Sequence, residues 1–208
     1  MKIAVIGAGN VGKALGKAWA RRGHDVNYGV RNPSDAKYGG LKTATVPEAA
    51  RAAEVILLAT PWDATEVALK SAGNLTGKLI LDATNPLSFG PQGIGLAIGH
   101  TTSGGEMVAG WAEGATVFKA LNTTGFNNME DTGGYGQKPV MFFAGDDQGQ
   151  RATVAALLSD LGFAPVDAGP LSNARLLEPY AMLWIDLALK RGHGTDIAFA
   201  LMKRARPA

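Results

Sequence analysis

The feature that most constrains this chain is a glycine-rich turn directly behind its first apolar run. Residues 2–6 form a strand pattern, and the turn that follows reads Gly7-Ala8-Gly9-Asn10-Val11-Gly12. A helical pattern covers about residues 10–22, and a second strand pattern covers 25–30. In such a unit the three glycines allow a tight turn, close approach of a pyrophosphate to the backbone, and close packing of helix on strand. A purely structural turn is the alternative, but the flanking elements favour a dinucleotide site.

The other apolar runs are short and alternate with helical patterns, which is typical of β–α units. The predicted strands lie at about residues 2–6, 25–30, 43–45, 55–59, 78–82, 116–121, 140–144 and 164–167. The predicted helices lie near residues 10–22, 47–53, 62–72, 104–113, 148–161 and 172–191. Because the central strands are apolar at successive positions, we expect an α/β fold of the Rossmann type, doubly wound, with a mostly parallel sheet and helices on both faces.

We expect one domain over residues 1–208, with a C-terminal extension from about residue 165 that includes the long helix. Residues 196–202 alternate apolar and small side chains and are compatible with a final strand. No stretch approaches the roughly 20 apolar residues of a membrane span, and the amino end lacks a signal-peptide pattern. We therefore expect a cytoplasmic protein without a membrane partner.

Composition excludes several classes of chemistry and partner. The chain has no cysteine, so disulfides, iron–sulfur ligation and thiolate catalysis are excluded. The formal net charge is only +2, and the basic residues are scattered rather than gathered in the stripe that nucleic-acid binding requires. No group of His, Asp and Glu has the spacing of a metal site, so we expect no bound metal.

The end of the second strand indicates which dinucleotide binds. Enzymes that use NAD usually place Asp or Glu there to bind the ribose hydroxyls. This chain instead reads Val30-Arg31-Asn32-Pro33-Ser34, with no acid before Asp35. The guanidinium of Arg31 is a charged donor suited to a 2′-phosphate. We therefore predict NADP(H), bound in this region by Val30, Arg31, Asn32 and Ser34; an exposed surface arginine is the alternative.

Three further strand ends carry polar turns, namely Thr60-Pro61-Trp62, Asn85-Pro86 and Asn122-Thr123. In an open α/β sheet the ligand lies beyond the carboxyl ends of the strands, so the nicotinamide should reach these turns. Their amides and hydroxyls are suited to holding its carboxamide. Thr-Pro and Asn-Pro are also ordinary turn formers, which would explain any one of them alone.

No acid–base constellation accompanies these turns in the sequence. His24 and His193 lie in glycine-containing turns, His100 lies in a glycine-rich loop, and Lys119 is expected to extend from its strand towards solvent. Reduction of a carbonyl generally needs a positioned proton donor. Hydride transfer between two stacked rings mostly needs proximity. We therefore predict no catalytic side chain and a reaction governed by cofactor positioning.

Four stretches also carry a family resemblance: Gly7 to Gly12 with Arg31, Thr60-Pro61-Trp62, Lys119-Ala120-Leu121-Asn122-Thr123, and Asp167-Ala168-Gly169-Pro170-Leu171-Ser172-Asn173-Ala174-Arg175. Together they resemble the NADP-dependent deazaflavin oxidoreductases, which exchange a hydride between NADP(H) and coenzyme F-420. The reductase domain of the STEAP metalloreductases shares the pattern. The resemblance implies NADP(H) held at the glycine turn, Arg31, Thr60, Asn85 and Asn122, with a deazaflavin or flavin ring stacked over the nicotinamide.

Two other functions stay open. One is a carbonyl or imine reductase with His100 or Lys119 as proton donor, and the other is a non-catalytic NADP(H)-binding redox module. The long helix at 172–191 carries more apolar positions, Tyr180 and Trp184 among them, than one core face requires. We therefore expect a homodimer through this helix, although burial against the chain's own sheet would also explain the pattern.

Overall fold

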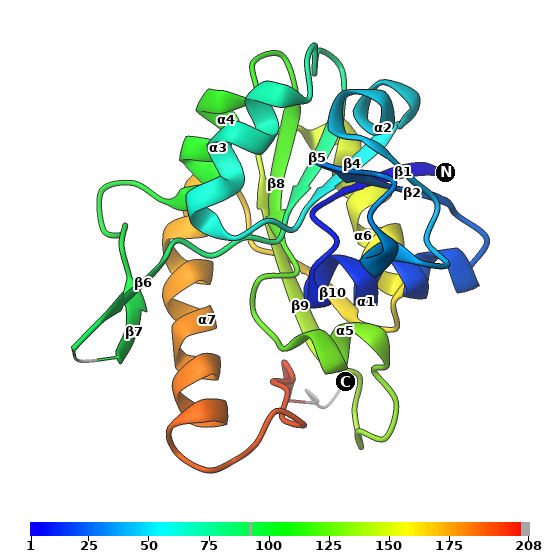
Figure 1. Cartoon of the computed structure of the whole chain (residues 1–208). Coiled ribbons are helices and arrows are strands. Elements are labelled where there is room, and N and C mark those ends of the chain that lie inside the picture. Colours follow the sequence, from blue (N-terminus) through cyan, green and yellow to red (C-terminus); the bar gives the residue numbers. More distant parts are fainter. Residues whose placement is uncertain (92, 205–208) are drawn as a thin grey trace.

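The structure is a computed structural model that describes residues 1–91 and 93–204 (Figure 1). Its main sheet has eight strands: β1 (Lys2–Ile6), β2 (Asp25–Val30), β3 (Thr43–Thr45), β4 (Val55–Leu58), β5 (Leu79–Asp82), β8 (Thr116–Ala120), β9 (Val140–Gly145) and β10 (Ala164–Asp167). Their spatial order is β10-β9-β8-β5-β4-β1-β2-β3. Only the β8–β9 pair in this sheet is antiparallel. The chain winds outward from β1 in both directions, which confirms the doubly wound Rossmann-type fold.

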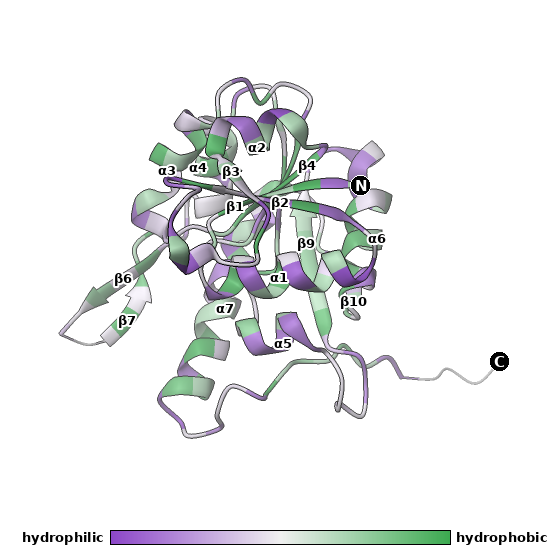
Figure 2. Ribbon diagram, turned by 45° about the vertical axis from the view of Figure 1, so that its right-hand side comes forward, coloured by the Kyte–Doolittle hydropathy of each residue, from purple (hydrophilic) through white to green (hydrophobic). Residues whose placement is uncertain are grey.

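Helices cover both faces of this sheet (Figure 2). They are α1 (Asn10–Arg21), α2 (Val46–Ala52), α3 (Trp62–Ser71), α4 (Gly104–Trp111), α5 (Phe126–Glu130), α6 (Arg151–Asp160) and α7 (Ala174–Leu189). α1, α5 and α6 pack on one face, and α2, α3 and α4 pack on the other. No helix within the described residues has both the length and the apolar content needed to cross a membrane.

Successive strand side chains enter opposite cores, as the period of a strand requires. In β1, Ile3 and Val5 join the core under α1, whereas Ala4 and Ile6 join the core under α2. β4 divides in the same way and is buried at every position. This two-sided burial explains why these strands read as continuous apolar runs in the sequence.

The structure adds elements that the sequence did not predict. β6 (Leu87–Gly90) and β7 (Gly93–Leu96) form a separate antiparallel hairpin that projects beside α7 (Figure 1). Glycine at three of these eight positions obscures the alternation by which a strand is recognised. α5 was also missed, because its five residues are too few for a helical period to show.

The predicted final strand at 196–202 is wrong. This segment forms no strand, because among the described residues a single backbone hydrogen bond joins it to β9, and its other bonded carbonyl accepts from side chains. Phe199 O accepts from Val140 N at 2.8 Å, and Ile197 O accepts from the side chains of Asn128 and Trp184. Residues 205–208 of the predicted extension lie outside the described part of the chain.

Tyr180 and Trp184, which suggested a dimer helix, are covered by the chain itself. The Tyr180 ring packs on Phe142 and Phe199, with ring centroids 5.6 and 4.7 Å apart, and Trp184 is 6% exposed. The exposed apolar side chains of α7 are instead Leu176, Leu183 and Leu189. A homodimer through this helix stays a prediction, and these leucines are the residues on which it now depends.

The ring of Phe118 is fully buried between β8 and Gly145, so we expect Phe118→Ala to leave a cavity. The substitution should lower the free energy of unfolding by about 3–5 kcal/mol, measured by chemical denaturation. Phe89→Ala is the matched control, because this ring is 77% exposed and its removal should change stability by about 0.5 kcal/mol or less. Equal losses in the two variants would contradict the assigned core.

Candidate functional site

Two of the three turn glycines are required by close packing. Gly7 has φ +103°, and a Cβ there would lie 2.5 Å from Ala59 O at the end of β4. A Cβ on Gly12 would lie 1.9 Å from Gly7 O. The first glycine therefore permits the turn, and the third lets α1 lie against the end of β1.

The second glycine of this turn, Gly9, lies at the open amino end of α1. Gly9 is the N-cap of α1, no side chain bonds to the first amides of the helix, and its first turn has no acidic residue. The first backbone bond of the helix runs from Lys13 N to Gly9 O at 2.9 Å. A Cβ on Gly9 would meet nothing within 4 Å. Free amides at the positive end of a helix dipole, with open space above them, form an anion site.

A cleft of about 560 Å³ begins beside this helix end. Its lining comes from the turn, from the ends of β4 and β5, and from the hairpin: Val11, Ala59, Thr60, Pro61, Trp62, Asp63, Ala83, Thr84, Asn85, Leu87, Ser88 and Phe89. The cleft lies where the strand order reverses, between β1 and β4, which is the usual ligand position in a doubly wound sheet.

The hydroxyl of Thr60 offers an acceptor to the cleft. Buried Thr65 donates its only hydroxyl hydrogen to Pro61 O at 3.0 Å. Since Thr65 Oγ1 also lies 2.9 Å from Thr60 Oγ1, the Thr60 hydroxyl must be the donor of that second bond. Its remaining lone pairs can therefore accept from a ligand, but it has no hydrogen left to give.

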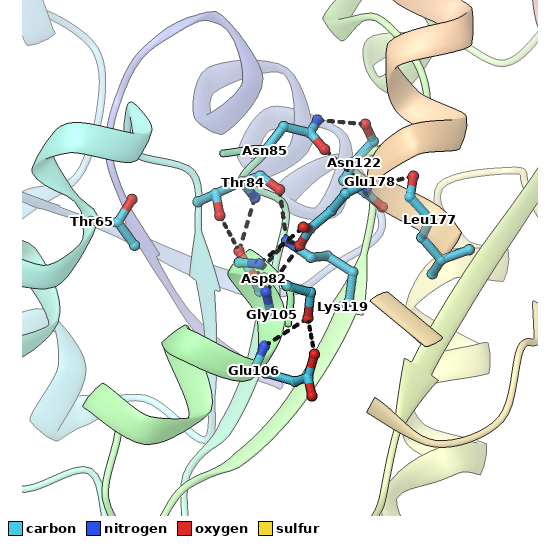
Figure 3. Close-up of polar contacts among 12 residues, drawn as sticks. Thr65, Asp82, Thr84, Asn85, Gly105, Glu106, Lys119, Asn122, Leu177 and Glu178 are labelled. Atoms are coloured by element: carbon cyan, nitrogen blue, oxygen red, sulfur yellow. Dashed lines mark hydrogen bonds and ion pairs between the residues drawn. The ribbon is translucent and has the colours of Figure 1, made fainter. Parts of the chain in front are cut away.

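Asn85 and Asn122 form a reciprocal amide pair at the ends of β5 and β8 (Figure 3). Asn85 Nδ2 donates to Asn122 O at 2.8 Å, and Asn122 Nδ2 donates to Asn85 Oδ1 at 3.1 Å and to Leu177 O at 3.2 Å. Asn122 is 4% exposed, yet its Oδ1 has no hydrogen-bond partner among the described residues. A buried orphan acceptor costs free energy unless a ligand supplies the donor.

In the loop after β2, Arg31 is a cation without a carboxylate partner among the described residues. Arg31 is exposed and forms no ion pair or hydrogen bond in residues 1–91 and 93–204. Asn32 Oδ1 accepts from Ser34 N at 3.2 Å, which shapes the turn. Lys37, the nearest other cation, binds Asp35 at 2.8 Å, and this hydrogen bond lowers the pKa of the Asp35 carboxyl. Arg31 is thus the charge that this loop presents to an anion.

Some of the predicted site residues line the cleft with their side chains, and others do not. Val11, Thr60, Pro61, Trp62 and Asn85 line the cleft together. Two others point elsewhere, since Val30 is 5% exposed in the core and Thr123 donates its hydroxyl to Met141 Sδ at 3.6 Å. Only the backbone of these two residues can face a ligand.

Sequence reasoning missed several lining residues. Thr84 precedes Asn85 just beyond the end of β5, so the same strand-end position that indicates Asn85 also indicates Thr84. Leu87, Ser88 and Phe89 belong to the unpredicted hairpin, and nothing in their local sequence placed them against the cleft.

The expectation that Lys119 extends towards solvent is wrong. Its side chain is fully buried, with Nζ 2.7 Å from Asp82 Oδ2 and 2.9 Å from Glu178 Oε1. Burial alone would lower the pKa of Lys119, but the two carboxylates outweigh it and raise the pKa above its ordinary value. Because it is buried and holds its proton tightly, Lys119 cannot serve as a proton donor to a substrate in the cleft.

The histidines do not reach the cleft either. His24 lies remote from the cleft lining, 3.0 Å from Asp160, and His100 lines a different groove beside α7.

The different surroundings of Gly9 and Gly12 permit a direct test. Gly12→Ala should destabilise the fold by about 1–3 kcal/mol, because the added methyl group must displace the backbone at Gly7. Gly9→Ala should change stability by about 1 kcal/mol or less but weaken NADPH binding, because its methyl group fills the space above the free amides. Thermal unfolding and fluorescence titration measure the two effects. A stable Gly12→Ala protein, or unchanged NADPH binding in Gly9→Ala, would contradict this assignment.

Comparison with known proteins agrees with this geometry. Residues 2–86 match the family described as "NADP oxidoreductase coenzyme F420-dependent". The chain is 30% identical over 213 residues to the F420-dependent NADP reductase of Methanothermobacter marburgensis, covering 91% of this chain and 93% of that protein. It is 27% identical over 180 residues to metalloreductase STEAP3 of Rattus norvegicus, covering 85% of this chain but only 36% of that longer protein.

Solved structures of known proteins are also similar to this chain. A crystal structure of a candidate F420-dependent NADP-reductase from Arthrobacter sp. FB24 superposes with a TM-score of 0.89 at 32% identity, covering 98% of this chain and 100% of that one. A reductive aminase from Aspergillus terreus shares the fold alone, with a TM-score of 0.68 at 23% identity over 92% of this chain and 62% of that one. From its identity to full-length relatives, together with the family match over its amino-terminal part, the chain belongs to the coenzyme F420-dependent NADP oxidoreductase family and is an NADP-dependent oxidoreductase.

Proposed function

We propose that this protein binds NADP(H) across the carboxyl edge of its sheet and transfers a hydride between it and a deazaflavin or flavin, such as coenzyme F-420. The observation that carries the proposal is the open amino end of α1, where free amides face the space above Gly9. A pyrophosphate is the anion that this fold brings to that position. The names of the full-length relatives support the choice of acceptor.

The chain's own residues fix the orientation of the dinucleotide. Arg31, which has no carboxylate partner among the described residues, suits the 2′-phosphate at the adenosine end. At the other end, Thr60 Oγ1 and Asn122 Oδ1 are available only as acceptors, which suits the NH₂ group of the nicotinamide carboxamide. Donors and acceptors therefore match one direction of binding.

The second ring requires an apolar surface facing the nicotinamide. Trp62, Leu87 and Phe89 supply such a surface in the cleft, and Phe89 is 77% exposed there. Bound NADPH supplies the hydride from its nicotinamide ring. The protein's part is to hold the two rings with reacting atoms about 3–3.5 Å apart and to exclude water from between them. Asp63 is the one ionisable side chain among the described residues that line the cleft, and an aspartate carboxyl ordinarily carries no proton to donate at neutral pH. The lining has no His, Lys or Tyr, which favours ring-to-ring transfer over carbonyl reduction.

Arg31→Ala should weaken NADPH binding by roughly ten- to a hundredfold and leave NADH binding nearly unchanged, because only NADPH carries the 2′-phosphate. Isothermal titration of both cofactors measures the difference. Arg22→Ala is the control, since this arginine is also exposed but lies at the far end of α1. Equal affinities of the variant and the parent for NADPH would contradict the assignment of the 2′-phosphate to Arg31.

A panel of acceptors tests the reaction itself. With NADPH as donor, we expect faster turnover of coenzyme F-420 or FMN than of ferric citrate or a cyclic imine. Phe89→Ala should raise the KM for the ring acceptor without changing the Kd of NADPH, because Phe89 lines the cleft and we assign its side chain to the second ring. Turnover of the imine alone would favour the imine reductases, whose fold this chain shares. Failure with every acceptor would favour a non-catalytic NADP(H)-binding module.

A further inference from the structure

Three charged side chains are enclosed directly behind the cleft. Asp82, Lys119 and Glu178 come from β5, β8 and α7, and their side chains are 0%, 0% and 1% exposed. We call these three residues the buried charge cluster (Figure 3). The proposed reaction uses none of them directly, so their presence needs a separate explanation.

Three oxygen atoms surround the Lys119 ammonium. Nζ lies 2.7 Å from Asp82 Oδ2 and 2.9 Å from Glu178 Oε1, and it donates to Thr84 O at 2.8 Å. The side chain of Lys119 is fully buried among these oxygens, so its ammonium does not face the cleft. The third of these contacts, the hydrogen bond to Thr84 O, matters most for function, because Thr84 is a lining residue of the cleft.

Asp82 also binds Thr84, through the carboxylate oxygen that does not contact Lys119. Its Oδ1 accepts from Thr84 N at 2.9 Å and from Thr84 Oγ1 at 2.7 Å. The amide, the carbonyl and the hydroxyl of Thr84 are thus all bound by two members of the cluster. A planar peptide bond joins Thr84 to Asn85, so the backbone nitrogen of Asn85 is held together with its anchored neighbour.

Glu178 connects the cluster to two helices. Its carboxylate accepts from Gly104 N at 2.9 Å and from Gly105 N at 3.0 Å, so it caps the amino end of α4 from α7. A Cβ on Gly105 would lie 3.2 Å from Lys119 Cε, which shows how closely the elements approach. The adjacent carbonyl of Leu177 accepts from Asn122, so α7 also holds the second residue of the amide pair.

We propose that Lys119 is a positioning residue, which through Asp82 and Glu178 sets Thr84, Asn85 and Asn122 where the nicotinamide carboxamide binds. This inference rests on the proposed function. Stability alone explains the cluster poorly, because replacing a complete buried ion cluster with well-packed apolar groups of similar volume is often neutral or stabilising. Three hydrogen bonds join the cluster to one lining residue, Thr84, which indicates that the cluster serves to fix the geometry of the cleft.

The test replaces the whole cluster without leaving an unpaired charge, in the variant Asp82→Asn/Lys119→Met/Glu178→Gln. We expect a folded protein whose NADPH affinity stays close to that of the parent, because the α1 amides and Arg31 are unchanged. Single-turnover hydride transfer to coenzyme F-420 should fall by roughly ten- to a hundredfold. The kinetic isotope effect with deuterated NADPH should rise as transfer becomes rate-limiting. Lys78→Met is the matched control, because Lys78 also binds backbone carbonyls but lies at the opposite edge of the sheet.

A readout without turnover accompanies the kinetics. NMR of the protein alone should show slow exchange of the Asn122 side-chain NH₂ in the parent and in Lys78→Met, and faster exchange in the triple variant. If the triple variant does not fold, Glu178→Gln is compared with the parent by the same measurements. Unchanged hydride transfer and unchanged Asn122 exchange in a folded variant would overturn the positioning role. A parent that binds NADPH but reduces no acceptor would contradict the proposed function instead, and the exchange measurement would still decide the role of Lys119.

Discussion

The ammonium of Lys119 joins four parts of the molecule at one point behind the cleft. It binds the end of β5 through Asp82 and Thr84, and through Glu178 it connects α7 to the amino end of α4. A buried ammonium is unfavourable unless several acceptors replace its water. Here burial would lower the pKa of Lys119, and the carboxylates raise it further than burial lowers it. The carboxyl edge of the sheet therefore depends on α7, although α7 lies late in the sequence.

Much of the fold could be predicted because its signals are local. The order strand, Gly7 to Gly12, helix can be read in one short window, and each glycine has the environment that its place in the motif implies. The same holds for strands such as β4, where burial on both faces gives an unbroken apolar run. Parallel pairing then brings Thr60 and Asn85 to one edge, since strands of one direction end on the same side.

The rest could not be read because its partners are distant in sequence. Nothing near Lys119 indicates that Asp82 and Glu178 lie beside it, so an isolated lysine in a strand was expected to reach solvent. Tyr180 looked surplus to the core only because its partners Phe142 and Phe199 belong to other segments. The β6–β7 hairpin could not be predicted for another reason. Its glycines interrupt the alternation of side chains by which a strand is recognised, although three of its residues line the cleft.

The pattern of hydrogen-bond donors and acceptors around the cleft restricts the choice of ligand more than the shape of the cleft does. Thr60 donates its hydroxyl hydrogen to Thr65, and Thr84 donates its hydroxyl hydrogen to Asp82, so both hydroxyls can only accept from a ligand. The side-chain oxygen of Asn122, which has no partner among the described residues, is also an acceptor. At the opposite end the α1 amides and Arg31 are donors only. A ligand that fits must therefore carry anionic oxygens at one end and N–H or O–H groups at the other. A dinucleotide with a nicotinamide carboxamide meets both conditions, and the reversed orientation would leave phosphate oxygens facing acceptors.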